Sequence, residues 1–308
     1  MSLKIAILGG TSHIARAITP YLLKSGAEVT LFARTPAKLE KAPCRVSTLG
    51  LPQRMAENFD IVINCIGAGT PKELAGDCSR WFSVLEEFDN MALKYLREKN
   101  PAALYVLFSS GAVYGRKNNA PEENDSCWQL CPNRITAADY YGIAKLYSEA
   151  KHRSYPALRI ADLRIFSFFS RHIDLDSGYF MTDLITALLN GETFMTTPTD
   201  ILRDYPHPAD LADLILRCSN EVSINRAIDV ASTAGISKFE LLQLFEKEFS
   251  LKYGIAENGI PASPNGNTAI YLPTGKMAAD ALNWRAKYSS CETVLSETKA
   301  IFDLYGKA

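Results

Sequence analysis

The chain has 308 residues, of which 47% are hydrophobic and 22% are charged, and its formal net charge is −1. The near-neutral charge excludes a protein dominated by contacts with nucleic acid or with an anionic membrane surface. No apolar run approaches the roughly 20 residues that a membrane-spanning helix needs, and no secretory signal precedes the first strand. Seven cysteines without framework spacing predict free thiols in a reducing compartment, so we expect a cytoplasmic protein without a metal site.

Short apolar runs alternate with amphipathic helical patterns through the first half of the chain. Strands that are each followed by a helix are typical of a parallel sheet covered by helices on both faces. Right-handed crossovers make this a doubly wound sheet, with its ligand site beyond the carboxyl ends of the strands. In chain order the predicted elements are strand 4–8, helix 14–24, strand 28–33, strand 60–66, helix 80–99, strand 103–110, helix 139–153 and strand 158–166.

The alternation weakens in the second half, where helical patterns dominate. Ser237 and Glu240 have the spacing of a capping box at the start of one of these helices. We therefore predict a nucleotide-binding domain over 1–165, joined by about 205–232, and a smaller α/β substrate lobe over 166–308. The helices predicted in this half cover 178–190, 208–219 and 237–249.

A polar segment rich in Pro and Asn, residues 116–136, separates the strand 103–110 from the helix 139–153. A stretch of this length without regular structure is uncommon inside a compact domain and often forms the wall of an active site. The alternative is a surface excursion. The sequence leaves both interpretations open.

The turn after the first strand, "ILGGTSHIAR" at 7–16, has part of the pattern of a phosphate-binding loop. Dinucleotide-binding turns space three glycines so that backbone approaches a pyrophosphate at a helix N-terminus. Here Gly9 stands in the first place, whereas Ser12 and Ala15 occupy the next two. Both replacements are small, and the Ser12 hydroxyl adds a donor for phosphate. The turn therefore predicts a modified nucleotide site.

A second constellation combines a strand-end serine with a tyrosine–lysine pair. Tyr141 and Lys145 are four residues apart in a predicted helix, so both side chains project from one face. A nearby ammonium lowers the pKa of a phenol from its ordinary value of about 10, which suits proton transfer. Ser110 ends a predicted strand, where its hydroxyl faces the ligand crevice and is placed to bond a substrate oxygen. Either half alone is common, but the two in this order are far more specific.

Motifs along nearly the whole chain resemble those of the extended short-chain dehydrogenase/reductase family, which includes sugar-nucleotide epimerases, dehydratases and ketoreductases. "SSGAVYG" at 109–115 resembles the serine motif of that family, and "YYGIAK" at 140–145 resembles its Tyr-x-x-x-Lys motif. The resemblance implies a Rossmann dinucleotide-binding domain with a smaller C-terminal α/β substrate lobe. Further matches, in the order of the family, are "DIVINCIGA", "LRIFSFFS", "RDYPHPADLADLI", "IDVASTAGISKFELLQLF" and "TGKMAADALNWRAKY".

The resemblance also implies a role for each residue of the constellation. Tyr141 is implied to donate or accept the proton at the sugar carbon being oxidised or reduced. Lys145 is implied to lower the phenol pKa and to bind the nicotinamide ribose hydroxyls, and Ser110 to orient the reacting oxygen. Arg203 stands where the family often places an arginine on the diphosphate of the sugar nucleotide, with a surface ion pair as the alternative. His207 is expected to be structural.

The resemblance favours NADP as the cofactor, with NAD as the alternative. Family members that prefer NAD carry an acid at the end of the second strand, whereas this chain has Arg34 there, with Lys38 nearby. A guanidinium suits the 2′-phosphate of NADP, although a solvated basic residue at a helix start is the alternative. The positions implied to bind the dinucleotide are Gly9, Thr11, Ser12, His13, Ile14, Arg34, Ile66, Gly67, Tyr141 and Lys145.

Two departures from the family pattern bear on the reaction and on the substrate. Gly111 and Ala112 follow Ser110 at the positions where members that eliminate water carry Asp-Glu, so elimination lacks its usual acid and base. Ser167 and Ser170 replace an asparagine and a glycine of the family, which puts the usual diphosphate contact in question. Ser167 is nevertheless a predicted substrate-binding residue.

The leading hypothesis for function is an NADP-dependent reductase of a keto-sugar nucleotide, in which Tyr141 donates a proton as hydride reaches the carbonyl carbon. An epimerase that uses the same residues and retains NAD is the first alternative. A non-catalytic dinucleotide-binding protein with the same fold is the second. The resemblance further suggests a homodimer formed through the helices near 80–99 and 139–153.

Overall fold

The computed structural model describes residues 2–49, 57–67, 76–115, 120–123, 126–256 and 268–306. Its main sheet contains β1 (Lys4–Leu8), β2 (Glu28–Ala33), β3 (Arg45–Thr48), β4 (Ile61–Asn64), β5 (Leu104–Ser110), β6 (Arg159–Ile165) and β9 (Asn225–Val230). These strands lie in the order β3-β2-β1-β4-β5-β6-β9, and every neighbouring pair is parallel. The predicted doubly wound α/β fold is confirmed.

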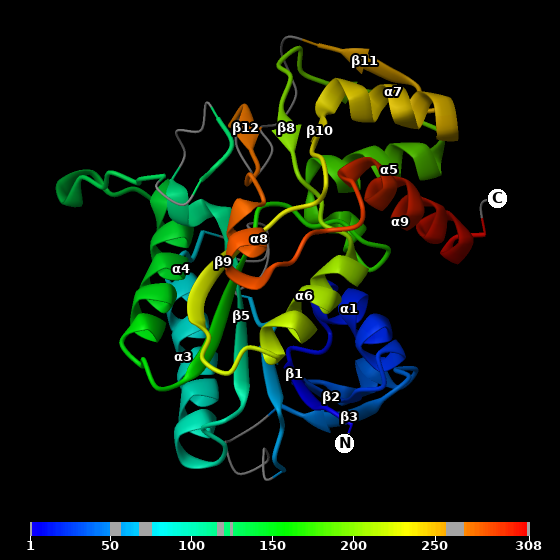
Figure 1. Ribbon diagram of the computed structural model, residues 1–308. Coiled ribbons are helices and arrows are strands. Elements are labelled where there is room, and N and C mark those ends of the chain that lie inside the picture. The colour runs from blue at the N-terminus through cyan, green and yellow to red at the C-terminus, as the bar shows by residue number, and fades with distance from the viewer. Residues whose placement is uncertain are drawn as a thin grey trace.

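Helices cover both faces of this sheet, as Figure 1 shows: α1 and α6 lie on one side of the strands, and α3 and α4 on the other. Alternate residues of β1 enter the two apolar layers, Ile5 and Ile7 on the α1 side and Ala6 and Leu8 on the α3 side. A strand buried on both faces needs an uninterrupted apolar run, which explains "KIAIL". The helices of this part are α1 (His13–Lys24), α3 (Arg80–Glu98), α4 (Ala137–Arg153), α6 (Pro208–Ser219) and α8 (Lys276–Leu282).

The smaller part packs α5 (Phe180–Asn190), α7 (Lys238–Phe249) and α9 (Ser290–Leu304) around their own apolar cluster (Figure 1). The predicted capping box of α7 is present, because Ser237 Oγ accepts from Glu240 N at 3.2 Å and Glu240 Oε2 accepts from Ser237 N at 2.8 Å. The short strands here are β7 (Phe194–Thr196), β8 (Leu202–Arg203), β10 (Ile236–Ser237), β11 (Tyr253–Ile255) and β12 (Ile270–Tyr271). They form one sheet in the order β10-β8-β12 and another that pairs β11 with β7. The sequence predicted neither these strands nor α9.

The segment that the sequence attached to the first domain, about 205–232, contributes α6 and β9. β9 adds to the edge of the main sheet beside β6, and the buried apolar side chains of α6 belong to the same layer as those of α1. His207, expected to be structural, caps α6 by accepting a hydrogen bond from Ala209 N at its Nδ1, and its ring stacks on Tyr288.

A buried polar network ties α3 and α4 to the sheet. The two ring nitrogens of His152 each lie 2.7 Å from a carboxylate oxygen, Nδ1 from Asp162 and Nε2 from Asp89. The Tyr105 hydroxyl donates to Asp89 at 2.9 Å, and the Asn64 amide donates to Tyr105 at 3.0 Å. All five side chains are buried. The network therefore runs from the last turn of α4 to the carboxyl end of β4.

Three further observations concern membrane-spanning helices, metal-binding groups and the cysteines. Within the described ranges, no helix combines the length and the apolar character needed to cross a bilayer. The same residues contain no group of three or more His, Cys, Asp or Glu side chains that could hold a metal ion. All seven cysteines are free thiols.

Candidate active site

The turn between β1 and α1 depends on two consecutive glycines. Gly9 has φ +76°, and a Cβ on it would lie 2.8 Å from Ile66 Cγ1. A Cβ on Gly10 would lie 2.7 Å from Leu31 Cβ, so the sequence analysis missed a second required glycine. The amides of both glycines donate to the carbonyl of Phe32 at 2.9 Å. The structure therefore brings the predicted cofactor residues Gly9 and Ile66 together at the carboxyl ends of β1 and β4.

The predicted cofactor residue Ser12 is the N-cap of α1. Its Oγ accepts a hydrogen bond from Ala15 N at 3.2 Å, and its side chain also hydrogen-bonds the Cys65 thiol. In the described part of the chain, the first-turn amides of His13 and Ile14 donate to no backbone carbonyl. Free amides at a helix N-terminus suit a phosphate group, so the residues present fit a dinucleotide.

A buried imidazole stands at the first position of α1. His13 Nε2 is buried and has no hydrogen-bond partner among the described residues, and the ring lies 5.0 Å from that of Phe168. Burial lowers the pKa of His13 to about 3, so the ring is neutral at physiological pH. Ser167, predicted to bind substrate, also has a buried hydroxyl without a partner in that same set. Two unsatisfied polar groups thus lie close to the predicted ligand edge.

The remaining predicted cofactor positions are exposed. Arg34 follows the last residue of β2, and among the described residues it forms no ion pair. Lys38 lies on a short 3₁₀ turn, Pro36–Leu39, and is exposed as well. Thr11 and Gly67 are also exposed, beyond the ends of β1 and β4 respectively. A free guanidinium at the carboxyl end of β2 is compatible with the predicted 2′-phosphate contact.

The structure brings the three predicted catalytic residues together. Ser110 is the last residue of β5, and its Oγ accepts from Ala112 N at 3.2 Å and hydrogen-bonds the Tyr141 side chain. Tyr141 and Lys145 lie one turn apart on α4, and the Lys145 Nζ is 5.8 Å from the centroid of the Tyr141 ring. Lys145 donates to the carbonyl of Phe108 at 2.7 Å. The cluster therefore joins the end of β5 to one face of α4.

The electrostatics of this cluster differ from the sequence expectation. Burial raises the pKa of Tyr141 above its ordinary value, and the hydrogen bond from Ser110 opposes that rise. Burial also lowers the pKa of Lys145 to about 8. Burial therefore outweighs any lowering of the phenol pKa in this structure, where the Lys145 Nζ lies 5.8 Å from the Tyr141 ring centroid and donates to the Phe108 carbonyl.

A charged network behind the serine motif was not predicted. Arg164 on β6 donates to Glu149 of α4 at 2.6 Å and to the Tyr114 hydroxyl at 2.6 Å. Ser109 donates to the same glutamate at 2.6 Å, and Tyr114 in turn donates to Asp229 of β9 at 2.9 Å. These bonds hold α4 against three strands and so fix the distance between Ser110 and Tyr141. Arginine and aspartate inside otherwise apolar strands were the available sequence signal.

Arg203, the predicted diphosphate ligand, is buried on β8. Its Nη1 donates to the carbonyls of Leu202 and Thr268, both at 2.9 Å, and its guanidinium lies 5.8 Å from the Tyr271 ring centroid. No carboxylate forms an ion pair with Arg203 within the described ranges, so the alternative of a surface ion pair fails there. Tyr271 was missed by the sequence analysis, although its hydroxyl lies 3.3 Å from Ser110 Oγ.

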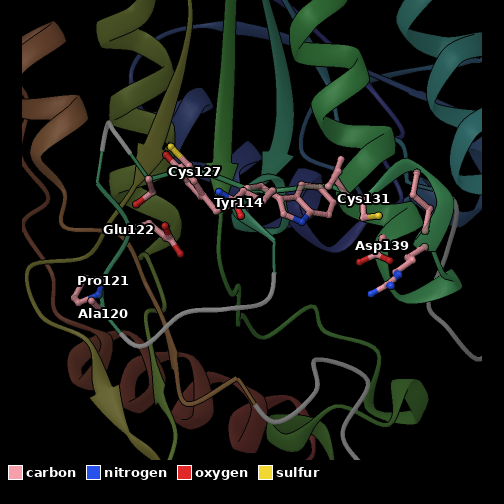
Figure 2. A pocket seen from close by; sticks show the side chains of 13 residues that line it. Tyr114, Ala120, Pro121, Glu122, Cys127, Cys131 and Asp139 are labelled. Atoms are coloured by element: carbon pink, nitrogen blue, oxygen red, sulfur yellow. The ribbon is translucent and has the colours of Figure 1, made fainter.

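A cavity of about 650 Å³ borders this cluster, and none of the three predicted catalytic side chains belongs to its lining. Figure 2 shows Ala120, Pro121 and Glu122 on one side, Cys131 and Asp139 on the other, and Tyr114 between them. Most of the lining comes from the polar segment 116–136, which supports its interpretation as a wall. Residues 116–119 and 124–125 of that segment lie outside the described residues. The full lining is Tyr114, Ala120, Pro121, Glu122, Ser126, Cys127, Trp128, Gln129, Leu130, Cys131, Arg134, Ile135 and Asp139.

A parallel α/β sheet with a glycine turn at β1 and a Ser–Tyr–Lys cluster at β5 defines the class of dinucleotide-binding proteins with short-chain dehydrogenase chemistry. The family model described as "NAD dependent epimerase/dehydratase family" matches residues 5–231. The chain belongs to this family, which confirms the resemblance to the extended short-chain dehydrogenases/reductases.

Similar proteins are named as sugar-nucleotide 4-epimerases. The UDP-glucose 4-epimerase of Streptococcus mutans is 25% identical over 226 residues, and the match spans 66% of this chain and 65% of that relative's length. Two solved structures have the same fold over 99% of this chain. The UDP-glucose-4-epimerase of Stenotrophomonas maltophila, with bound NAD, has a TM-score of 0.81 at 18% identity and 99% coverage of its chain. The UDP-N-acetylglucosamine 4-epimerase of Methanobrevibacter ruminantium has a TM-score of 0.80 at 19% identity and the same coverage.

Proposed function

We propose that this chain is an NAD(P)-dependent epimerase that inverts C4 of a UDP-linked sugar. The observation that carries the proposal is the Ser110–Tyr141–Lys145 cluster, joined across β5 and α4 at the carboxyl edge of the sheet. The names of similar proteins favour epimerisation over the keto-sugar reductase that led the sequence analysis. Epimerisation was the first alternative there.

In the proposed reaction, residues of this chain accept one proton and return it. The nicotinamide, when bound, supplies the hydride acceptor and donor. Tyr141 takes the proton of the sugar hydroxyl as its carbon is oxidised, and it returns a proton to the ketone oxygen as that carbon is reduced on the opposite face. Ser110 hydrogen-bonds the reacting oxygen. Lys145, whose ammonium donates to the Phe108 carbonyl beside the Tyr141 ring, would bind the ribose hydroxyls of the nicotinamide.

The same proposal assigns the binding residues. The Gly9 turn and the free amides of His13 and Ile14 would hold the pyrophosphate, and Arg203 would face the diphosphate of the sugar nucleotide. Elimination of water is disfavoured, because Gly111 lies where an acid would be needed. A Cβ at Gly111 would lie 2.5 Å from the Phe166 ring, so an aspartate does not fit there.

A second candidate, an NADP-dependent keto-sugar reductase, is favoured by Arg34 alone. An exposed arginine without an acidic partner in the described residues suits a 2′-phosphate, and no acid stands at the end of β2 to bind a ribose hydroxyl. A reductase must exchange its cofactor in each turnover, whereas an epimerase restores its own. Retention of the cofactor therefore separates the two candidates.

The deciding experiment releases whatever dinucleotide co-purifies with the protein and then titrates the emptied protein with NADPH and NADH by fluorescence. Stoichiometric NAD in the purified protein supports the epimerase. Selective and reversible NADPH binding, weakened about ten-fold to a hundred-fold in Arg34→Ala, supports the reductase. Arg45→Ala is the matched control. Arg45 is also exposed, but it is the first residue of β3 and therefore lies at the amino ends of the strands, away from the predicted ligand edge. If neither dinucleotide binds, the enzymatic proposal is wrong.

We further propose a cytoplasmic homodimer formed through α3 and α4. Leu146 and Tyr147 expose 37% and 48% of their surface on α4, and Tyr147 donates to Glu86 of α3 at 3.3 Å. A second copy would cover these apolar atoms. Sedimentation should give twice the 34.0 kDa chain mass, and Leu146→Glu should give the monomer. A monomeric wild-type protein would contradict this proposal.

A further inference from the structure

A second phenol reaches the predicted catalytic serine from the smaller part of the molecule. The Tyr271 hydroxyl on β12 lies 3.3 Å from Ser110 Oγ, although 161 positions separate the two residues. The Tyr271 ring lies 5.0 Å from the Phe166 ring, and the guanidinium of Arg203 lies 5.8 Å from its centroid. Tyr271 therefore contacts both the serine and the arginine of the proposed site.

Packing fixes the Tyr271 ring independently of its hydrogen bond. Phe166 lies so close to Gly111 that only a residue without a Cβ fits beneath it, and this brings the Phe166 ring onto the backbone of the serine motif. On the other side, strand register pairs Tyr271 with Arg203 across β12 and β8. The hydroxyl is consequently directed at Ser110 by the surrounding rings and strands.

The hydrogen-bonding capacity of Ser110 determines what Tyr271 does. A serine hydroxyl has one proton and two lone pairs. Ser110 Oγ accepts from Ala112 N, and it also hydrogen-bonds Tyr141 and Tyr271. A Tyr141 phenolate cannot donate, so Ser110 must give its only proton to Tyr141. The second lone pair of Ser110 then accepts from Tyr271, whose phenol stays protonated because burial raises its pKa.

We propose that Tyr271 is a positioning residue that acts through Ser110, directing the Ser110 proton toward Tyr141 and so stabilising the Tyr141 phenolate. Hydrogen bonds in a chain polarise one another, so Ser110 is a stronger donor while Tyr271 donates to it. A sugar oxygen bound between Ser110 and Tyr141 would accept the Ser110 proton in place of Tyr141, so the same direction of the hydrogen bond serves the substrate. The role rests on the proposed proton chemistry of Tyr141, but it holds for epimerisation and for reduction alike.

The test compares Tyr271→Phe with Tyr271→Leu in the full chain. Phenylalanine keeps the ring against Phe166 and Arg203 and removes only the hydroxyl, whereas leucine removes the ring too. The Tyr141 pKa is measured from phenolate absorbance, as the difference between each protein and the same protein carrying Tyr141→Phe. Tyr271→Phe should raise this pKa by about one pH unit, a ten-fold change in proton affinity. Ser110→Ala should raise it at least as much, and Tyr271→Phe should add nothing to Ser110→Ala.

The outcomes separate positioning from packing. If Tyr271 acted by packing alone, the Tyr141 pKa would be the same in Tyr271→Phe as in the wild type, and only Tyr271→Leu would change it. That result would overturn the proposal. The proposal would also be overturned if the two changes in the Tyr141 pKa added up in the variant that combines Tyr271→Phe with Ser110→Ala, because Tyr271 would then act without Ser110. Since the titration needs no substrate, the expected pKa shift in a protein without sugar-nucleotide turnover would refute the proposed function and leave this inference standing.

Discussion

Replacing Tyr141 with Phe is expected to lower turnover by about a hundred-fold to ten-thousand-fold, the range for loss of a general acid–base group. Phenylalanine keeps the ring that packs 5.7 Å from Trp81 and removes only the hydroxyl that bonds Ser110. The fold and dinucleotide binding should therefore stay close to those of the wild-type protein. Steady-state turnover of UDP-sugars, beside fluorescence titration with dinucleotide, measures both effects.

Tyr140→Phe is the matched control for this experiment. Tyr140 precedes Tyr141 on the same helix, and the centroid of its ring lies 6.1 Å from that of Phe82 on α3. Its substitution should leave turnover nearly unchanged. If Tyr141→Phe retained full activity, the proton would have to come from another group and the proposed mechanism would be wrong. If the wild-type protein bound dinucleotide but turned over no sugar nucleotide, the non-catalytic alternative would gain support.

Replacing His152 with Ala is expected to lower the free energy of unfolding by about 3 to 5 kcal/mol, the cost of breaking a buried ion pair from one side. His152 is fully buried between Asp89 and Asp162 and hydrogen-bonds both carboxylates. Lys151 and Arg153 would still pair with one carboxylate each, so the loss is not total. Chemical denaturation followed by circular dichroism measures the change.

The pH dependence of stability tests the charge on His152. Burial opposes the cation, but the hydrogen bonds to Asp162 and Asp89 outweigh it and raise the pKa of His152 to about 9. Because this value exceeds the unfolded value of about 6.5, the stabilisation is fully present below pH 6.5 and is lost as pH rises through about 9. His152→Gln keeps hydrogen-bonding groups without the charge, so its difference from the wild type should shrink over that interval.

His13→Ala is the control for loss of a buried imidazole. The pKa of His13 lies at about 3, so this ring is neutral above pH 6.5 and its removal should cost the same from pH 6.5 to 9. A destabilisation by His152→Gln that did not change with pH would mean that His152 is neutral in the folded protein. The network would then be hydrogen-bonded without a buried cation.

Much of the fold follows from local sequence patterns. The pattern that predicted a helix at 14–24 corresponds to α1, His13–Lys24, and that for 80–99 corresponds to α3, Arg80–Glu98. Apolar runs, caps and helical periodicity are properties of neighbouring residues, so they are visible without the tertiary structure. The two-residue strands β8, β10 and β12 were missed because two residues have no periodicity, and these strands exist only through pairing with one another.

The candidate site likewise combines features that local sequence determines with contacts that only the tertiary structure creates. By itself the sequence determined the Gly9 turn, the strand-end position of Ser110 and the shared helix face of Tyr141 and Lys145, because each depends on residues a few positions apart. Only the tertiary structure decided that Tyr271 meets Ser110 and that His152 joins two buried carboxylates. Those contacts arise when the sheet and helices pack, and burial then sets the protonation of the groups that meet. The spacing of residues along the chain does not indicate which distant side chains meet or how burial changes their protonation.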